Sequence, residues 1–224
     1  MYLQGGVTVV INRYLAEFMG TLILVFGGSM GILAAGGAGG AAEIILIAFA
    51  FGLALLAGIW ALGHVSGAHF NPAVTLGLLL DRRISLTDSI GYWVAQFAGA
   101  AVASLLVAGA SSTDVVAGTM TTYSDQGTGI LMEVALTAIF VWVVMASTGR
   151  SAGHHAPMAI SLTLVGVHLA GIPFSGASVN PARSFGPSVV SGTFEGLWVY
   201  LVFPLVGALI AYGLYRLFPA VDEA

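Results

Sequence analysis

The triplet Asn-Pro-Ala occurs twice in this chain, as Asn71-Pro72-Ala73 and as Asn180-Pro181-Ala182. Asparagine followed by proline favours the start of a helix, because asparagine caps the first turn and proline fits the first helical position. Each amide side chain can donate an N–H group to an oxygen atom, and a helix N-terminus carries a partial positive charge. The two triplets therefore predict a place that binds an uncharged, oxygen-bearing molecule and repels cations.

Four further positions, Phe51, His168, Ala177 and Arg183, are candidates for the wall of a narrow passage, here called the neck. Arg183 lies three residues beyond Asn180, in a stretch that contains no other charge. A charge within a hydrocarbon layer costs several kcal/mol unless it faces water or a partner. A fixed cation beside a neutral imidazole suits a polar, uncharged solute and excludes cations.

Glu17 and Glu133 are carboxylates in otherwise apolar stretches. Such groups carry protons in some transporters. The loops before the two triplets, however, contain N–H groups that need acceptors at membrane depth, so we expect the two carboxylates to hold these loops open. The loop carbonyls are then expected to line the passage, namely those of Gly67, Ala68, His69, Gly176, Ala177 and Ser178.

The composition indicates a membrane protein and excludes several classes of function. Of 224 residues, 58% are hydrophobic and only 7% are charged, whereas soluble domains carry about 25% charged residues. A net charge of −4 argues against a nucleic-acid partner. The chain has no cysteine, and its scattered histidines lack the spacing of a metal site. His64 and Ser66 lie two positions apart, but without a Gly-x-Ser-x-Gly elbow and an orienting acid the sequence predicts neither an enzyme nor a cofactor.

Six apolar stretches are long enough to cross a bilayer, which needs about 20 apolar residues per helix. They are Tyr14–Ala35, Ile44–Leu62, Ser89–Ala110, Gly129–Thr148, Pro157–Ile172 and Leu197–Phe218. Six spans place both termini on one side of the membrane. The arginines at positions 13, 82, 83, 150 and 216 fall on that side, so the positive-inside rule predicts cytoplasmic termini in a protein of the plasma (cytoplasmic) membrane.

Two shorter apolar segments remain, Asn71–Leu80 and Asn180–Val190, and each reaches only about half-way across a bilayer. They belong to an internal repeat with an offset of 109 positions, seen in the pairs Ser66 and Ser175, Gly67 and Gly176, and Asn71 and Asn180. Each half, about residues 12–110 and 129–218, holds three spans, and an odd number of spans inverts the second half. We expect an all-α membrane protein with six transmembrane helices plus two re-entrant half-helices, forming a single channel domain over residues 1–224.

The inverted repeat brings the N-termini of the two half-helices together near the membrane midplane. The second span begins outside, so Phe51 lies about 10 Å below its outer end. The fifth span begins inside, which places His168 in the outer half as well. Ala177 lies on the loop that descends from outside, and Arg183 lies just outward of the midplane. The four neck candidates therefore converge in the outer half of one pore.

These features together resemble the aquaporin (major intrinsic protein) family. The resemblance is carried by residues 66–74, Ser-Gly-Ala-His-Phe-Asn-Pro-Ala-Val, and by residues 175–186, Ser-Gly-Ala-Ser-Val-Asn-Pro-Ala-Arg-Ser-Phe-Gly. It covers nearly the whole chain. In that family the positions matching Phe51, His168, Ala177 and Arg183 form the selectivity neck. The resemblance also implies a homotetramer with one pore per subunit and water as the permeant.

The neck residues resemble the water-selective, prokaryotic-type branch more than the glycerol facilitators. Members that pass glycerol typically have Trp in place of Phe51, Gly in place of His168 and Asp in place of Ser184. Two positions, Ala177 and Leu201, depart from the strict water pattern and leave room for leakage of ammonia or hydrogen peroxide. A glycerol facilitator is the alternative. A secondary transporter would need carboxylates for a coupling ion at the midplane, where this chain has amides.

Overall fold

The computed structural model describes residues 3–37, 39–149 and 155–218, and the side chains from residue 11 onward. Arg150, one of the arginines behind the expected orientation, lies outside the described residues. The described chain forms nine helices: α1 Leu3–Ala35, α2 Ala41–Ser66, α3 Pro72–Leu80, α4 Leu86–Ala110, α5 Thr113–Ala117, α6 Gln126–Ser147, α7 Ala156–Ser175, α8 Pro181–Ser191 and α9 Leu197–Leu217.

Six of these helices, α1, α2, α4, α6, α7 and α9, are long and apolar enough to cross a membrane. The predicted all-α fold with six spans and two half-helices is thereby confirmed, and the protein is a multi-pass membrane protein. Helix α1 begins at Leu3, well before the predicted start at Tyr14, and the bounds of the other spans differ from the predicted ones by about one turn or less. Helix α2 continues past Leu62 to Ser66 and ends at Gly67, whose left-handed φ of 87° lets its N–H donate to the Gly63 carbonyl and close the last turn. Gly176, with φ of 72°, ends α7 in the same way.

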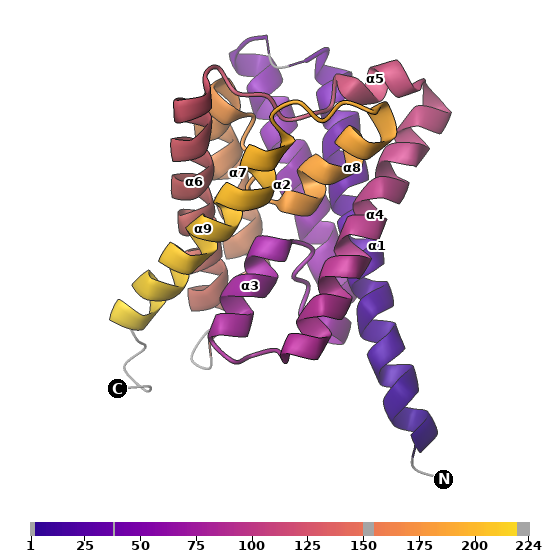
Figure 1. Cartoon of the computed structure of the whole chain (residues 1–224), viewed down its shortest axis with the longest axis vertical. Coiled ribbons are helices and arrows are strands. Elements are labelled where there is room, and N and C mark those ends of the chain that lie inside the picture. The colour runs from indigo at the N-terminus through magenta and orange to yellow at the C-terminus, as the bar shows by residue number, and fades with distance from the viewer. Residues whose placement is uncertain (1–2, 38, 150–154, 219–224) are drawn as a thin grey trace.

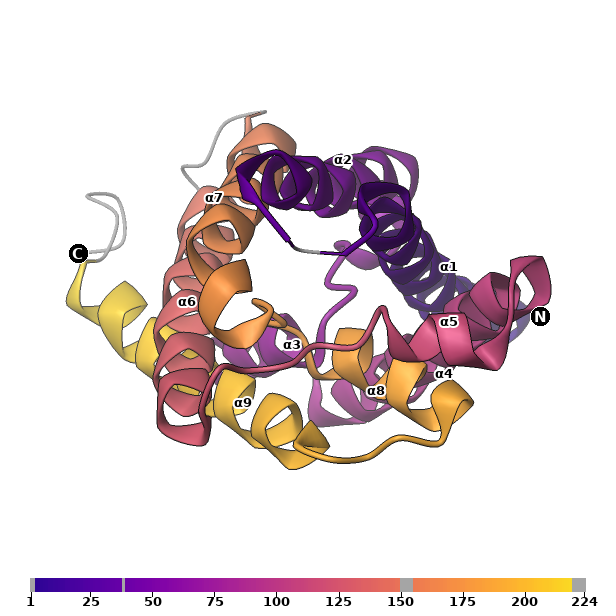
Figure 2. The ribbon, with the colours of Figure 1, turned by 90° about the horizontal axis from the view of Figure 1, so that it is seen from above.

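The six long helices lie around the two half-helices, α3 and α8. Helices α2, α1 and α4 follow one another around one side of the bundle, and α7, α6 and α9 around the other, with α2 against α7. Between α4 and α9 the wall is completed by α3 and α8, which touch both (Figure 2). Figure 1 shows that α1 begins and α9 ends at the same end of the bundle, which we call the terminal end. Helix α3 lies in that half and α8 in the opposite, far half.

Both half-helices begin at the asparagines of the triplets. The Asn71 side-chain oxygen accepts a hydrogen bond of 2.8 Å from the Ala73 N–H, and that of Asn180 accepts one of 3.0 Å from the Ala182 N–H. Proline occupies the first position of each helix, where its missing N–H costs nothing. The half-helices therefore start near the middle of the bundle and point their N-termini at each other.

Two close helix crossings are related by the sequence repeat. A Cβ atom on Gly207 of α9 would lie 2.7 Å from the Val134 carbonyl oxygen of α6, and one on Gly99 of α4 would overlap the Phe18 carbonyl oxygen of α1. Only glycine permits such an approach of two backbones. These crossings fix the outer helices that carry Glu17 and Glu133.

One element was not predicted from the sequence. The short helix α5 follows α4 at the far end, with the Ser112 hydroxyl accepting a hydrogen bond of 3.3 Å from the Val115 N–H. The chain then crosses the far end to Asp125, which caps α6 by accepting from the Thr128 N–H at 2.9 Å. Hydrogen bonds from the side chain and the backbone of Thr128 lower the pKa of the exposed Asp125 carboxyl. The connection between α5 and α6 lies over α8, and it contributes to the site.

Candidate functional site

The loop before α3 is fixed to the carboxylate of Glu17, which is fully buried on α1. Glu17 accepts hydrogen bonds from the Ser66 hydroxyl at 2.6 Å and from the backbone N–H groups of His69 at 3.0 Å and Phe70 at 2.7 Å. The Gln96 side-chain amide of α4 donates a further bond of 2.8 Å. One carboxylate on an outer helix thus binds the polar groups on one side of the loop.

Glu133 of α6 makes the corresponding contacts with the loop before α8. It accepts from the Ser175 hydroxyl, from the Ser178 N–H and from the Val179 N–H, each at 2.8 Å. Glu133 is also fully buried. The two carboxylates therefore occupy equivalent places in the two halves of the bundle.

The two loops share an unusual backbone. Ala68 and Phe70 in the first loop have φ of 54° and 48°, and Ala177 and Val179 in the second have φ of 48° and 46°. A left-handed conformation costs a residue with a side chain about 1–2 kcal/mol, so it persists only where surrounding bonds enforce it. The hydrogen bonds to Glu17 and Glu133 supply that constraint.

The six loop residues whose carbonyls are expected to line the passage do not all line the same cavity. No described residue donates a hydrogen bond to the carbonyls of Gly67, Ala68, His69, Gly176, Ala177 and Ser178. His69 and Ser178 line a central cavity, and Gly67 lines a wider cavity at the terminal end. Ala68, Gly176 and Ala177 line neither of these two cavities.

The two asparagine amides bind each other's loops across the midline. The Asn71 side-chain N–H donates to the Val179 carbonyl at 2.8 Å, and that of Asn180 donates to the Phe70 carbonyl at 2.9 Å. The sequence suggested that these amides donate to a solute. The structure shows that one of the two N–H hydrogens on each is already used, because the Val179 and Phe70 carbonyls need donors in a buried site. One hydrogen on each amide remains for a solute.

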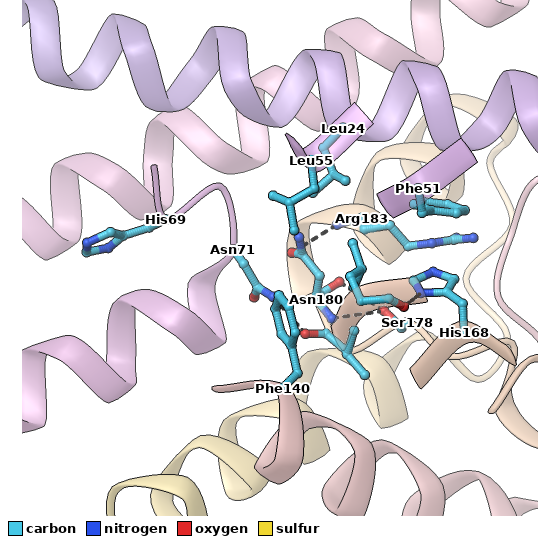
Figure 3. A pocket seen from close by; sticks show the side chains of 12 residues that line it. Leu24, Phe51, Leu55, His69, Asn71, Phe140, His168, Ser178, Asn180 and Arg183 are labelled. Carbon is cyan, nitrogen blue, oxygen red and sulfur yellow. Dashed lines mark hydrogen bonds between the residues drawn. The ribbon is translucent and has the colours of Figure 1, made fainter. Parts of the chain in front are cut away.

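The central cavity lies where the two loops meet, and it has a volume of about 20 Å³. A cavity of about 10–15 Å³ is enough to hold one water molecule. Its wall, part of which is seen in Figure 3, is formed by Leu24, Phe51, Leu55, His69, Asn71, Phe140, Leu164, His168, Ser178, Val179, Asn180 and Arg183. His69 also lines the wider cavity of about 570 Å³ at the terminal end, so the two cavities are adjacent.

Three of the four neck candidates come together on this wall (Figure 3). The rings of Phe51 and His168 are stacked, with centroids 4.5 Å apart and planes at 25°. The Arg183 guanidinium carbon lies 4.8 Å from the centre of the Phe51 ring. Ala177 does not line the cavity. It is fully buried and lies against Gly171 of α7, and the next residue, Ser178, faces the cavity instead.

His168 and Arg183 each present an unused nitrogen here. His168 Nδ1 lies 2.9 Å from the Leu164 carbonyl oxygen, which can only accept, so Nδ1 carries the hydrogen and a neutral ring offers Nε2 as an acceptor. His168 Nε2 and Arg183 Nε have no hydrogen-bond partner among the described residues. Arg183 is held by a bond of 3.1 Å from Nη1 to the Thr119 carbonyl. The neck therefore offers one acceptor and one charged donor to a passing molecule.

A row of hydroxyls connects the α5–α6 connection to the second loop. Thr121 Oγ1 lies 2.7 Å from Ser184 Oγ, Ser184 Oγ lies 2.6 Å from Ser178 Oγ, and Ser178 Oγ donates to the Asn180 carbonyl at 2.9 Å. Sequence reasoning missed Thr119 and Thr121 because their partners lie more than sixty positions away. No local sequence pattern predicts contacts between residues so far apart in the chain.

Removing the first hydroxyl of that row is expected to loosen the far end of the site. Thr121→Val keeps the side-chain shape but leaves the Ser184 hydroxyl with one partner fewer, at a cost of about 1 kcal/mol. The expected result is a lower midpoint of thermal unfolding in detergent. Thr122→Val, at an exposed neighbour, is the control and is expected to unfold like the wild type. Equal midpoints for both variants would contradict a role for Thr121.

Sequence reasoning also missed the apolar part of the cavity wall, although the repeat contains a signal for it. Leu55 and Leu164 are related by the offset of 109 positions, and both line the cavity. Leu24 and Phe140 are related by 116 positions, which is also the offset between Glu17 and Glu133. Extending the repeat to the apolar positions would have identified all four.

Comparison with known proteins gives this geometry a family. The sequence profile described as Major intrinsic protein matches residues 7–215. The chain belongs to the major intrinsic protein family. Aquaporin TIP2-1 from Zea mays is 42% identical over 215 residues, which cover 90% of this chain and 84% of that protein. The resemblance noted in the sequence is thereby confirmed, and members of this family are membrane channels rather than enzymes.

Some relatives of this major intrinsic protein are named aquaporins, and others are named for glycerol. Glycerol uptake facilitator protein-like 6 from Lactiplantibacillus plantarum is 38% identical over 210 residues, covering 90% of this chain and 95% of that protein. Among solved structures, the aquaglyceroporin from Plasmodium falciparum superposes with a TM-score of 0.86 at 26% identity, covering 96% of this chain and 100% of that one. Family membership therefore defines a membrane channel.

Proposed function

We propose that this major intrinsic protein is a passive water channel that carries water in single file and excludes glycerol, protons and ions. One observation carries the proposal: the cavity between the two loops has room for about one water molecule and is lined by Phe51, His168 and Arg183. Water can donate to His168 Nε2 and accept from Arg183. Glycerol, with three carbons and three hydroxyls, needs more room than the single water molecule that this cavity accommodates.

Proton exclusion follows from the meeting of the half-helices. The N-termini of α3 and α8 each contribute about half a positive elementary charge, and both point at the middle of the bundle. A water molecule that accepts from the remaining N–H groups of Asn71 and Asn180 must point its own hydrogens away. This orientation interrupts a proton wire, and the charge of Arg183 repels cations at the neck.

The setting of the channel is part of the same proposal. We place the protein in the plasma (cytoplasmic) membrane with the terminal end in the cytoplasm, since Arg13, Arg82, Arg83 and Arg216 belong to that end. The neck then faces outward. Residues 1–224 form one channel domain, and the subunits form a homotetramer with one pore each, as the family resemblance implies.

Replacing Arg183 is expected to weaken the exclusion of charge. Arg183→Val removes the fixed cation from the neck and leaves only the barrier at the two half-helices, so protons and small cations should cross faster than in the wild type while water flux persists. The assay follows a pH-sensitive dye inside proteoliposomes after an external pH step, with Arg216→Val as the matched loss of an exposed arginine at the end of α9. Proton flux in Arg183→Val at least about tenfold above Arg216→Val is expected. Equal fluxes from the two variants would contradict the proposed charge barrier.

A glycerol facilitator is the second candidate. It is favoured by the names of two similar proteins, the facilitator-like protein from Lactiplantibacillus plantarum and the aquaglyceroporin from Plasmodium falciparum. A facilitator would re-swell vesicles in glycerol as readily as it shrinks them in an impermeant osmolyte. The ratio of these two rates separates the candidates.

A further inference from the structure

Phe51 is enclosed between α1 and the rest of the neck. On the neck side lie the stacked ring of His168 at 4.5 Å and the Arg183 guanidinium at 4.8 Å. On the α1 side the ring lies where a side chain of Gly28 would be, because a Cβ atom on Gly28 would overlap the ring atoms Cδ1, Cε1 and Cζ of Phe51. The ring is 2% exposed, and the free space beside it is the cavity that it lines.

We propose that Gly28 is a positioning residue that sets the width of the neck by giving the Phe51 ring a place against α1. The proposal deepens the proposed water pore and rests on it. Gly28 does not touch the permeating molecule. It acts through Phe51, whose ring would otherwise stand closer to His168 and Arg183 and would fill the cavity of about 20 Å³.

The rest of the α1–α2 contact separates this role from general helix packing. Gly27 and Gly31 also face α2, where a Cβ atom on Gly27 would lie 2.8 Å from the Ala54 Cβ and one on Gly31 would overlap the Ala50 Cβ. These two glycines meet small side chains that do not line the cavity. Gly28 is the member of the group that meets a pore-lining ring.

A second buried aromatic ring, that of Phe70, is accommodated by α1 in the same way. A Cβ atom on Gly20 would overlap the ring of Phe70, and one on Gly58 of α2 would lie 3.0 Å from that ring. The Phe70 carbonyl accepts the hydrogen bond from Asn180. Helix α1 therefore uses one glycine for the aromatic ring beside the Asn-Pro-Ala loop and another for the aromatic ring of the neck.

The test compares water permeability of proteoliposomes containing four variants. Gly28→Ala is expected to lower the permeability on the order of tenfold, because the added methyl group pushes Phe51 into the neck. Gly166→Ala, on α7 with nothing within 4 Å of the added atom, is expected to match the wild type. Gly27→Ala disturbs the same helix contact without touching Phe51 and is expected to lose far less than Gly28→Ala. The double variant Gly28→Ala with Phe51→Leu is expected to regain water flux.

The outcomes decide between positioning and simple damage. Wild-type permeability in Gly28→Ala, an equal loss in Gly27→Ala, or no recovery in the double variant would each overturn the proposal. If Gly28→Ala alone does not give a monodisperse protein, the double variant carries the test: folding and conduction support the proposal, and their absence refutes it. Failure of the wild type to carry water would instead refute the water pore itself, which keeps the two failures distinguishable.

Discussion

Replacing His168 by glycine is expected to convert the pore into one that carries glycerol. The substitution removes the imidazole that is stacked 4.5 Å from the Phe51 ring and leaves the neck both wider and less polar. A narrow site excludes large solutes only while its walls are fixed. The loss of the whole imidazole side chain removes this limit on solute size. We expect glycerol permeability to rise by about tenfold or more, while water permeability stays high.

The measurement is the re-swelling of proteoliposomes after an osmotic step with glycerol. His64→Gly is the matched control, because His64 lines the wide cavity of about 570 Å³ at the terminal end, where the same chemical change removes no constriction. Glycerol flux should rise in His168→Gly and remain at the wild-type level in His64→Gly. An unchanged glycerol flux in His168→Gly would show that another part of the pore limits solute size.

Replacing Glu133 by leucine is expected to prevent the protein from folding. The substitution leaves the Ser175 hydroxyl and the Ser178 and Val179 N–H groups without their common acceptor. Each buried donor left unpaired costs about 1–3 kcal/mol, so the three together cost about 3–9 kcal/mol. That sum is comparable with the whole stability of a typical domain, about 5–15 kcal/mol.

Two further variants make the Glu133 prediction specific. Glu133→Gln keeps one acceptor oxygen but turns an NH₂ group toward one of the donors, so an intermediate loss is expected. Glu43→Leu, in the first turn of α2, removes a partly exposed carboxylate and is expected to leave the protein intact. The comparison uses yield of monodisperse protein in detergent and the midpoint of thermal unfolding. A Glu133→Leu protein as stable as Glu43→Leu would contradict the account of the loop.

The architecture was predictable because it follows from features repeated along the chain. Apolar length fixes the six spans, and the paired Asn-Pro starts fix the two half-helices. The repeat with three spans in each half then implies inversion of the second half, which brings Phe51, His168 and Arg183 to one level of the pore. Periodicity and topology suffice for such placements, since they require only helix rise and direction.

Other features depend on contacts that no spacing encodes. The hydrogen bonds of Asn71 and Asn180 to the opposite loops depend on where two distant carbonyls come to lie, and the sequence therefore suggested amides directed only at a solute. The Thr119 carbonyl that binds Arg183 lies in the connection between α5 and α6. No local sequence pattern predicts the path of this connection over α8. The left-handed backbone of Ala177, which lies against Gly171 while Ser178 lines the cavity, likewise has no signal in the sequence.

The most direct test of the water-selective pore is stopped-flow light scattering of wild-type proteoliposomes, comparing an impermeant osmolyte with glycerol in the same vesicle preparation. The account predicts rapid shrinkage in both solutions, far faster than in empty vesicles, with re-swelling in glycerol no faster than in empty vesicles. Rapid re-swelling in glycerol would contradict it and would assign the protein to the glycerol facilitators.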